Sequence, residues 1–212
     1  MQQFLFGTSA LNSTSQLFAT SVFKAHLTLL YMIESVQPHY ENKSVVLETI
    51  GSVLATSFLP DGINVLKMAF TKKVTSLGKT NREWFATTIK ALDHQIESGF
   101  GEAEIQLAPI HLSVLEQIEA LSPEDATAGM RLRTLATITE NSIIPSADID
   151  DLISALTDKA EELKVSGKIW IQNPLTAMLA QAEITDGLLD ETNVTGLPLT
   201  TKGQGVKAVA AE

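Results

Sequence analysis

Apolar residues in the N-terminal part of the chain recur in alternating steps of four and three. The pattern runs through Phe18, Val22, Ala25, Leu29, Met32 and Val36. Residues at this spacing lie on one side of an α-helix, so the pattern predicts a helix with one apolar face. Pro38 ends this helix, because a proline disfavours helical backbone in the residue before it.

Three further apolar stripes follow within the first hundred residues. The first of them predicts a helix over residues 44–58, in which Gly51 indicates either close helix packing or a weak point. The inward residues of the three stripes are Val46, Ile50 and Val53; Ile63, Leu66, Phe70, Val74 and Leu77; and Phe85, Ile89, Leu92 and Ile96. Four helices in so short a segment predict a helical bundle.

The ends of these helices carry capping signals. Asp61 is placed to accept hydrogen bonds from the free N–H groups that open the third helix. Gly78 is a candidate C-cap for that helix, and Thr80 with Glu83 predicts a capping box at the start of the fourth.

The second half of the chain begins with three more predicted helices. Pro109 is suited to the first helical position of one of them. A strong start signal for the next combines a cap, a proline and acids near the positive end of the helix dipole, in Ser122, Pro123, Glu124 and Asp125. Ser146 opens the third. The inward residues are Ile110, Val114, Ile118 and Leu121; Leu132 and Leu135; and Ile149, Leu152, Leu156, Ala160 and Leu163.

The C-terminal part changes character after Gly167. Residues 168–171 alternate polar and apolar side chains and predict a strand, and residues 194–199 are suited to a second one. Between them Pro174 starts a short helix. The predicted fold class is mainly α, a helical bundle with a small C-terminal β-hairpin. The predicted domains are an N-terminal helical bundle over residues 1–100 and a C-terminal helical region with a strand pair and a tail over residues 107–212.

A short motif near the end of the chain consists of Gly187, Leu188, Leu189 and Asp190 followed by Leu197, Pro198, Leu199, Thr200, Thr201, Lys202 and Gly203. It resembles the end of a winged-helix module, in which a helix closes on a Gly-Leu-Leu step before a hairpin wing and a Leu-Thr-x-x-Gly turn. The chain departs from the family in having one helix, rather than two, between the first strand and the wing. The resemblance implies contact with protein rather than DNA, because Asp186, Asp190 and Glu191 are acidic where DNA binding needs basic residues.

Cysteine is absent from the 212 residues, which excludes disulfides, thiolate metal sites and thiol nucleophiles. The hydrophobic fraction of 44% is too high for a disordered chain. The longest stretch without charge ends at Phe23, but polar residues interrupt it and no basic segment precedes it. We therefore expect neither a signal peptide nor a membrane-spanning helix, and a location in the cytoplasm or in a virus particle.

The charges are distributed unevenly along a chain with a formal net charge of -10. A basic stretch consists of Lys67, Lys72, Lys73, Lys79, Arg82 and Lys90, with Glu83 as its only acid. It is a candidate site for phosphate, an anionic membrane or the acidic stretch that follows it in another copy, unless it is only the solvated side of two amphipathic helices. Nucleic acid is not expected as a partner, because the net charge is negative and few aromatic residues lie between the basic ones.

Motifs for metal binding and catalysis are missing from the sequence. His26, His39, His94 and His111 lack the i, i+4 spacing that puts two imidazoles on one metal. No nucleophile elbow, phosphate-binding glycine loop or dinucleotide fingerprint is present. We therefore expect no catalytic residue, metal or cofactor. An enzyme would need a pocket that joins His94 or His111 to a carboxylate.

These observations favour a non-enzymatic protein that binds protein partners, including other copies of itself. Two alternatives stay open. One is a structural or assembly subunit of a virus particle, since helical chains rich in threonine and alanine suit such lattices. The other is a helical protein that inserts into membranes through the weakly charged residues 44–58 and the uncharged first two dozen residues.

Overall fold

The computed structural model describes residues 24–59, 62–98, 107–142, 144 and 146–194. These residues are mainly helical, which confirms the predicted fold class at that level. The helices are one over residues 24–35, α2 (Lys43–Thr56), α3 (Ile63–Ser76), α4 (Glu83–Ser98), α5 (Ile110–Glu119), α6 (Ala128–Glu140), α7 (Ser146–Glu162) and α8 (Ile169–Val194). The described residues contain no strand, only an isolated parallel bridge between Ser57 and Ala108.

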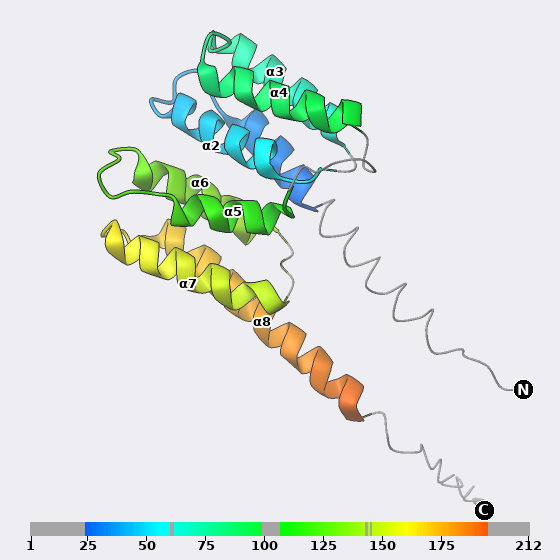
Figure 1. Ribbon diagram of the computed structural model, residues 1–212. Coiled ribbons are helices and arrows are strands. Elements are labelled where there is room, and N and C mark those ends of the chain that lie inside the picture. Colours follow the sequence, from blue (N-terminus) through cyan, green and yellow to red (C-terminus); the bar gives the residue numbers. More distant parts are fainter. Residues whose placement is uncertain (1–23, 60–61, 99–106, 143, 145, 195–212) are drawn as a thin grey trace, which may run out of the picture.

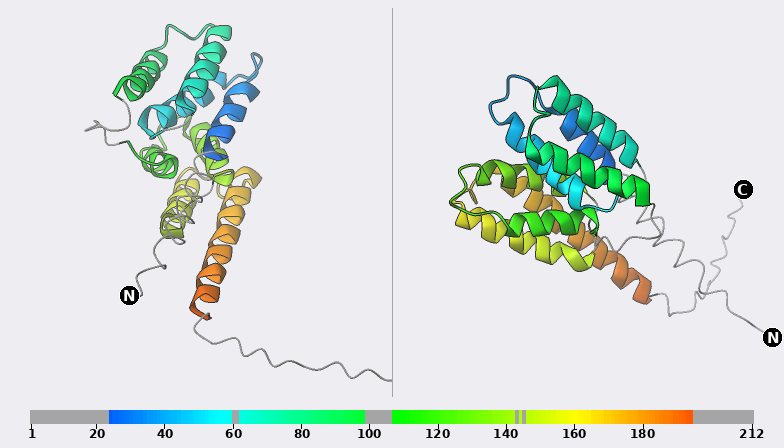
Figure 2. Two further views of the ribbon diagram at one scale, coloured as in Figure 1. Left: turned by 90° about the vertical axis from the view of Figure 1, so that its right-hand side faces the viewer. Right: turned by 45° about the horizontal axis from the view of Figure 1, so that its top comes forward.

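The helices stack as pairs in two layers (Figures 1 and 2). One layer contains α4, α2, α5 and α7 in that order, and the other contains α3, the helix over residues 24–35, α6 and α8. The pair α3–α4 therefore lies at one end of the stack and the pair α7–α8 at the other. The bridge at Ser57 joins the segment after α2 to the segment before α5. The predicted domain boundary, between residues 100 and 107, lies outside the described residues.

The predicted apolar stripes pack against one another in one hydrophobic cluster. In the first stripe Ala25, Leu29, Met32 and Val36 are buried, while Phe18 and Val22 lie outside the described residues. The later stripes are buried through Ile50, Val53, Ile63, Leu66, Phe70, Val74, Leu92, Ile110, Val114, Ile118, Leu132, Leu135, Ile149, Leu152, Leu156 and Ala160. The sequence pattern therefore identified most of the core correctly.

The tightest contact in this core is between α2 and α4. A Cβ atom added to Gly51 would lie 2.7 Å from Thr88 Oγ1 and 3.0 Å from Phe70 Cζ. The Phe70 ring is fully buried, and its centroid lies 6.1 Å from that of Trp84 and 6.2 Å from that of Phe85. Gly51 thus marks close helix packing, the first of its two predicted roles.

The end of α3 confirms the role predicted for Gly78. This residue has a φ of 64°, and the N–H of Lys79 donates to the carbonyl of Val74 at 3.0 Å, while the N–H of Gly78 donates to that of Thr75. These two bonds form a Schellman motif, which satisfies the last carbonyls of the helix.

The predicted starts of three helices need correction. The capping box at Thr80 is wrong, because α4 begins at Glu83 and places that residue first in the helix instead of third. Pro109 occupies the N-cap of α5 rather than its first helical position. Asp61 lies outside the described residues, and Gly62, with a φ of 82°, is the N-cap of α3.

The start signal at residues 122–125 is also wrong, since α6 begins later, at Ala128. Asp125 Oδ1 accepts hydrogen bonds from the N–H and the hydroxyl of Thr127, both at 2.7 Å. The backbone bond to Thr127 is the main reason why the pKa of the Asp125 carboxyl is lowered. The segment therefore uses its polar side chains to form turns before the helix starts.

The C-terminal region departs most from the prediction. Residues 168–171 do not form a strand, because α8 starts at Ile169 and contains Pro174 instead of starting at it. α8 continues through Gly187 to Asp190, the first part of the winged-helix-like motif, and ends at Val194. Val194, the first residue of the second predicted strand, is the last residue of α8, and the rest of that strand, the predicted wing and the tail lie outside the described residues.

Candidate functional site

One side of α8 is exposed and almost free of charge. The exposed residues, here called the α8 face, are Ile169, Gln172, Asn173, Thr176, Ala177, Leu179, Ala180, Glu183 and Ile184. Their spacing places them on one side of the helix, opposite the buried Ile171, Pro174 and Met178. Glu183 is the only charged residue from position 169 to position 184.

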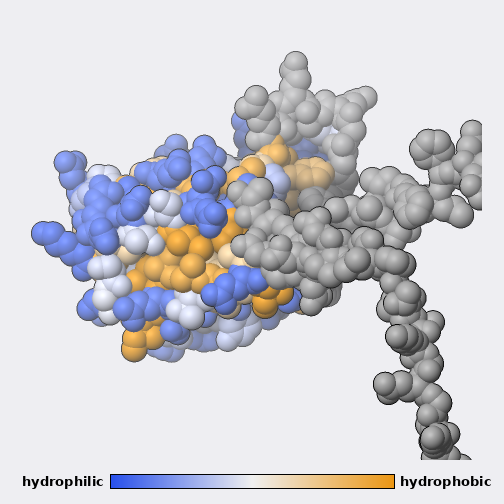
Figure 3. Space-filling model, turned by 90° about the horizontal axis from the view of Figure 1, so that it is seen from below, coloured by the Kyte–Doolittle hydropathy of each residue, from blue (hydrophilic) through white to orange (hydrophobic). Residues whose placement is uncertain are grey.

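Three large apolar side chains stand out on the α8 face. Ile169 is 72% exposed, Leu179 52% and Ile184 66%. Figure 3 looks onto the α7–α8 end of the stack and shows apolar surface in the middle of this end, with hydrophilic surface around it. A cluster of exposed apolar side chains with a polar rim is typical of a protein-binding surface.

The neighbouring helix α7 has the opposite character. Of its described side chains, those that are exposed are Asp150, Asp151, Ser154, Asp158, Glu161 and Glu162. The only neutral one among them is Ser154. The end of the stack therefore combines a helix that is nearly uncharged over residues 169–184 with a strongly acidic one.

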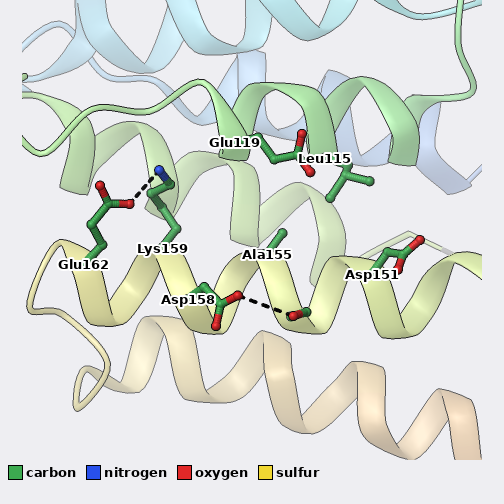
Figure 4. A pocket seen from close by; sticks show the side chains of 8 residues that line it. Leu115, Glu119, Asp151, Ala155, Asp158, Lys159 and Glu162 are labelled. Atoms are coloured by element: carbon green, nitrogen blue, oxygen red, sulfur yellow. Dashed lines mark hydrogen bonds and ion pairs between the residues drawn. The ribbon is translucent and has the colours of Figure 1, made fainter.

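A shallow hollow of about 540 Å³ lies between α5 and α7, within this acidic region (Figure 4). Glu119 reaches into it from α5, and Asp151 and Asp158 from α7. The cation in its lining is already engaged, since Lys159 Nζ lies 2.7 Å from Glu162 Oε2 and donates to the carbonyl of Leu121 at 2.7 Å. The hollow is thus an open acidic surface that suits a cationic partner.

The basic residues of the predicted patch have different surroundings. Lys67 forms an ion pair with Asp93 of α4. Lys73 Nζ donates to the carbonyls of Glu34 at 2.7 Å and Val36 at 3.1 Å, and so caps the helix over residues 24–35. Lys72 is exposed on α3.

Of the remaining basic residues, Arg82 and Lys90 line two different hollows. Arg82 lines a groove of about 820 Å³ between α2, α4 and α5, together with Trp84 and the acidic Glu48, Glu83 and Glu116. Lys90 lines a separate hollow on α4, and Lys79 follows α3. The structure therefore divides the predicted patch between helix capping, ion pairing and two separate hollows.

The exposed side of α3 is a second surface with few charges. Its exposed residues, here called the α3 face, are Asn64, Val65, Met68, Lys72, Thr75 and Ser76. Val65 is 55% exposed and Met68 73%. Lys72 is the only charged member of the face.

His111 is joined to a carboxylate. Its Nε2 lies 3.0 Å from Asp148 Oδ2, and its side chain is 10% exposed. Burial lowers the pKa of His111 from 6.5, and Asp148 opposes this only in part. At neutral pH the pair is therefore a hydrogen bond from a neutral imidazole to a carboxylate, not an ion pair, and it ties the start of α5 to the start of α7.

The other histidines have different surroundings. His94 Nδ1 lies 3.1 Å from Ser98 Oγ and the ring lines the hollow on α4 that also contains Lys90. His26 is buried beside Gly62, and His39 is exposed against Tyr40. Among the described residues no group of three histidines and carboxylates is arranged to hold a metal ion.

None of the helices in the described part of the chain is both long and apolar enough to cross a membrane. A scan against models of protein families finds no match, and searches of curated proteins and of solved structures find no significant one.

Proposed function

We propose that the protein is a non-enzymatic interaction module whose partners include further copies of itself. The observation that carries this proposal is the α8 face, where Ile169, Leu179 and Ile184 are exposed on a helix with a single charged residue over sixteen positions. α8 has large apolar side chains on its exposed side as well as on its buried side, whereas a surface helix usually has charged or polar residues on its exposed side.

Fully burying an isoleucine or leucine side chain stabilises a complex by about 1.5–3 kcal/mol before the cost of association is subtracted. Ile169, Leu179 and Ile184 are already partly covered, so each contributes a fraction of this value. The three side chains are therefore the main apolar anchors of an interface to which the rest of the α8 face also contributes. An anionic membrane is a poorer partner, because the carboxylates of α7 beside this face would be repelled by it.

The test measures the mass of the full chain by sedimentation over a concentration series. We expect the average mass to rise with concentration in the native protein and to rise much less in Leu179→Asp. Tyr40→Asp is the matched control, because Tyr40 is 48% exposed, close to the 52% of Leu179, but lies outside α8. A native chain that remains monomeric at the highest attainable concentration contradicts self-association.

A second candidate function is that of a structural subunit in a larger assembly such as a virus particle. It is favoured by the difference between the two ends of the stack, because a subunit with two unlike surfaces can add further subunits without limit. Immunodetection in purified particles tests it. Absence of the protein from such particles removes this candidate.

A further inference from the structure

We propose that copies of this chain join head to tail, with the α8 face of one copy on the α3 face of the next. This arrangement rests on the proposed self-association and specifies which two surfaces meet and that the copies all point in the same direction. α3 and α8 belong to the same layer of helices and lie at opposite ends of the stack (Figures 1 and 2). A copy added in this way would continue the stack.

The two faces match in their apolar side chains. The α3 face presents Val65 and Met68, three residues apart and therefore on the same side of the helix. Met68 is suited to this contact, since its unbranched side chain adapts to an irregular partner surface. The α8 face presents isoleucine and leucine side chains against which both can pack.

The two faces also match in charge. Each contains one charged residue, Lys72 on the α3 face and Glu183 on the α8 face. Each of these residues belongs to a segment with a net charge of the same sign as its own. Residues 62–98, around Lys72, contain six basic and three acidic side chains, whereas residues 146–184, around Glu183, contain seven acidic and three basic ones. Opposite charges around an interface favour encounter and orient the partners.

The same charges oppose a symmetric contact between two α8 faces. Such a pairing would bring the carboxylates of α7 in one copy near those in its partner, and juxtaposed like charges weaken association. The α3 face is the better counterpart, because it offers apolar side chains on a helix that contains three lysine residues and no acidic one.

A head-to-tail contact uses two different surfaces of each copy. Each bound copy therefore leaves one α3 face and one α8 face free for further copies. Contacts of this kind produce rings when the rotation between copies closes and open filaments when it does not. The protein would thus form species larger than dimers as its concentration rises.

Two blocked variants test the polarity directly. Met68→Asp places a charge on the α3 face, and Leu179→Asp places one on the α8 face, so each variant keeps one intact surface. Both side chains are exposed, and circular dichroism checks that both variants keep their helices. We expect each variant alone to associate more weakly than the native chain by about tenfold or more, because the new carboxylate would be desolvated in the contact.

An equal mixture of the two variants gives the decisive result. The intact α8 face of Met68→Asp can bind the intact α3 face of Leu179→Asp, so the mixture should form a one-to-one dimer that grows no further. If Met68→Asp alone still forms dimers while Leu179→Asp does not, the contact is between two α8 faces. That result overturns the head-to-tail geometry and leaves self-association standing.

The salt dependence separates the same two arrangements. Head-to-tail contact joins opposite charges, so added salt should weaken association of the native chain. If two acidic α7–α8 ends are in contact, added salt should strengthen association, because it would screen the repulsion between them. A native chain that stays monomeric at every salt concentration contradicts the proposed function itself. If the native chain associates but the mixture of the two blocked variants forms no dimer, the head-to-tail geometry is overturned.

Discussion

His111 of α5 and Asp148 of α7 are joined across 3.0 Å between Nε2 and Oδ2, and the burial of the imidazole makes this contact sensitive to pH. The neutral imidazole uses its Nε2 hydrogen for the bond to the carboxylate. The contact links two helices that pack side by side in one layer, so its protonation state affects the stability of the stack.

We expect His111 to make the folded state less stable as the pH falls. Its folded-state pKa is below 6.5, so below that pH the unfolded chain takes up a proton before the folded chain does. The contribution of His111 to the free energy of unfolding is fully present above pH 6.5 and is lost as the pH falls through the folded-state pKa of His111. The free energy of unfolding, measured with urea between about pH 7.5 and about pH 5, should fall less in His111→Gln than in the native chain. His39→Gln, at an exposed position, is the control, and equal pH profiles for His111→Gln and the native chain would refute the prediction.

Gly51 at the contact between α2 and α4 and Gly129 in α6 predict opposite effects of substitution by alanine. Gly51→Ala should lower the free energy of unfolding by about 1–2 kcal/mol, because its Cβ would lie 2.7 Å from Thr88 Oγ1. Gly129→Ala should raise it by about 0.5 kcal/mol, because a Cβ there meets no atom within 4 Å and alanine favours the helix. Thr88→Ala in the Gly51→Ala background should restore part of the loss. Chemical denaturation measures all three, and a Gly51→Ala variant as stable as the native chain would show that the helices separate easily.

Lys73 and its neighbour Lys72 allow a matched test of helix capping. Lys73→Met should lower the free energy of unfolding by about 1 kcal/mol, because the carbonyls of Glu34 and Val36 lose their donor. Lys72→Met should change it by less than about 0.5 kcal/mol, since this side chain is exposed. Urea unfolding at low protein concentration measures both. Equal effects of the two substitutions would mean that capping contributes nothing measurable.

Arg131 connects α6 to α2. Its Nη2 lies 3.1 Å from Glu48 Oε1, and its Nε donates to Thr127 Oγ1 at 3.0 Å. A double-mutant cycle of Arg131→Met and Glu48→Gln should give a coupling energy of about 0.5–1 kcal/mol, because the pair is only partly exposed. The control cycle combines Glu48→Gln with Arg133→Met, because Arg133 is exposed, and its coupling energy should be near zero.

The sequence predicted the helices best where the apolar stripe was long and its end was marked. The stripe at Ala25, Leu29 and Met32 and the stop at Gly78 agree with the structure, because spacing and backbone preference act locally. Residues 168–171 were predicted wrongly, because four alternating residues are too few to separate a strand from a helix. The packing of Ile171 and Met178 in the core is consistent with the helix at that place.

The candidate interaction surface was harder to predict. The sequence pointed to the basic residues from Lys67 to Lys90, but two of the first three, Lys67 and Lys73, bond within the fold. The α8 face was missed, although the single charge between Ile169 and Ile184 was visible in the sequence. A run of that kind reads equally well as a buried helix, so its exposure could not be predicted.

Sequence alone determined that most of this chain forms amphipathic helices, roughly where they lie and, outside α8, which side of each is apolar, because these properties depend on neighbouring residues and on backbone geometry. Tertiary structure decided which apolar sides are covered and which charges are neutralised. Leu66 and Met68 illustrate the difference, since both are apolar residues of α3, yet Leu66 is fully buried and Met68 is 73% exposed. The physical reason is that burial depends on which helix lies alongside, and that neighbour is set by packing between residues far apart in the chain.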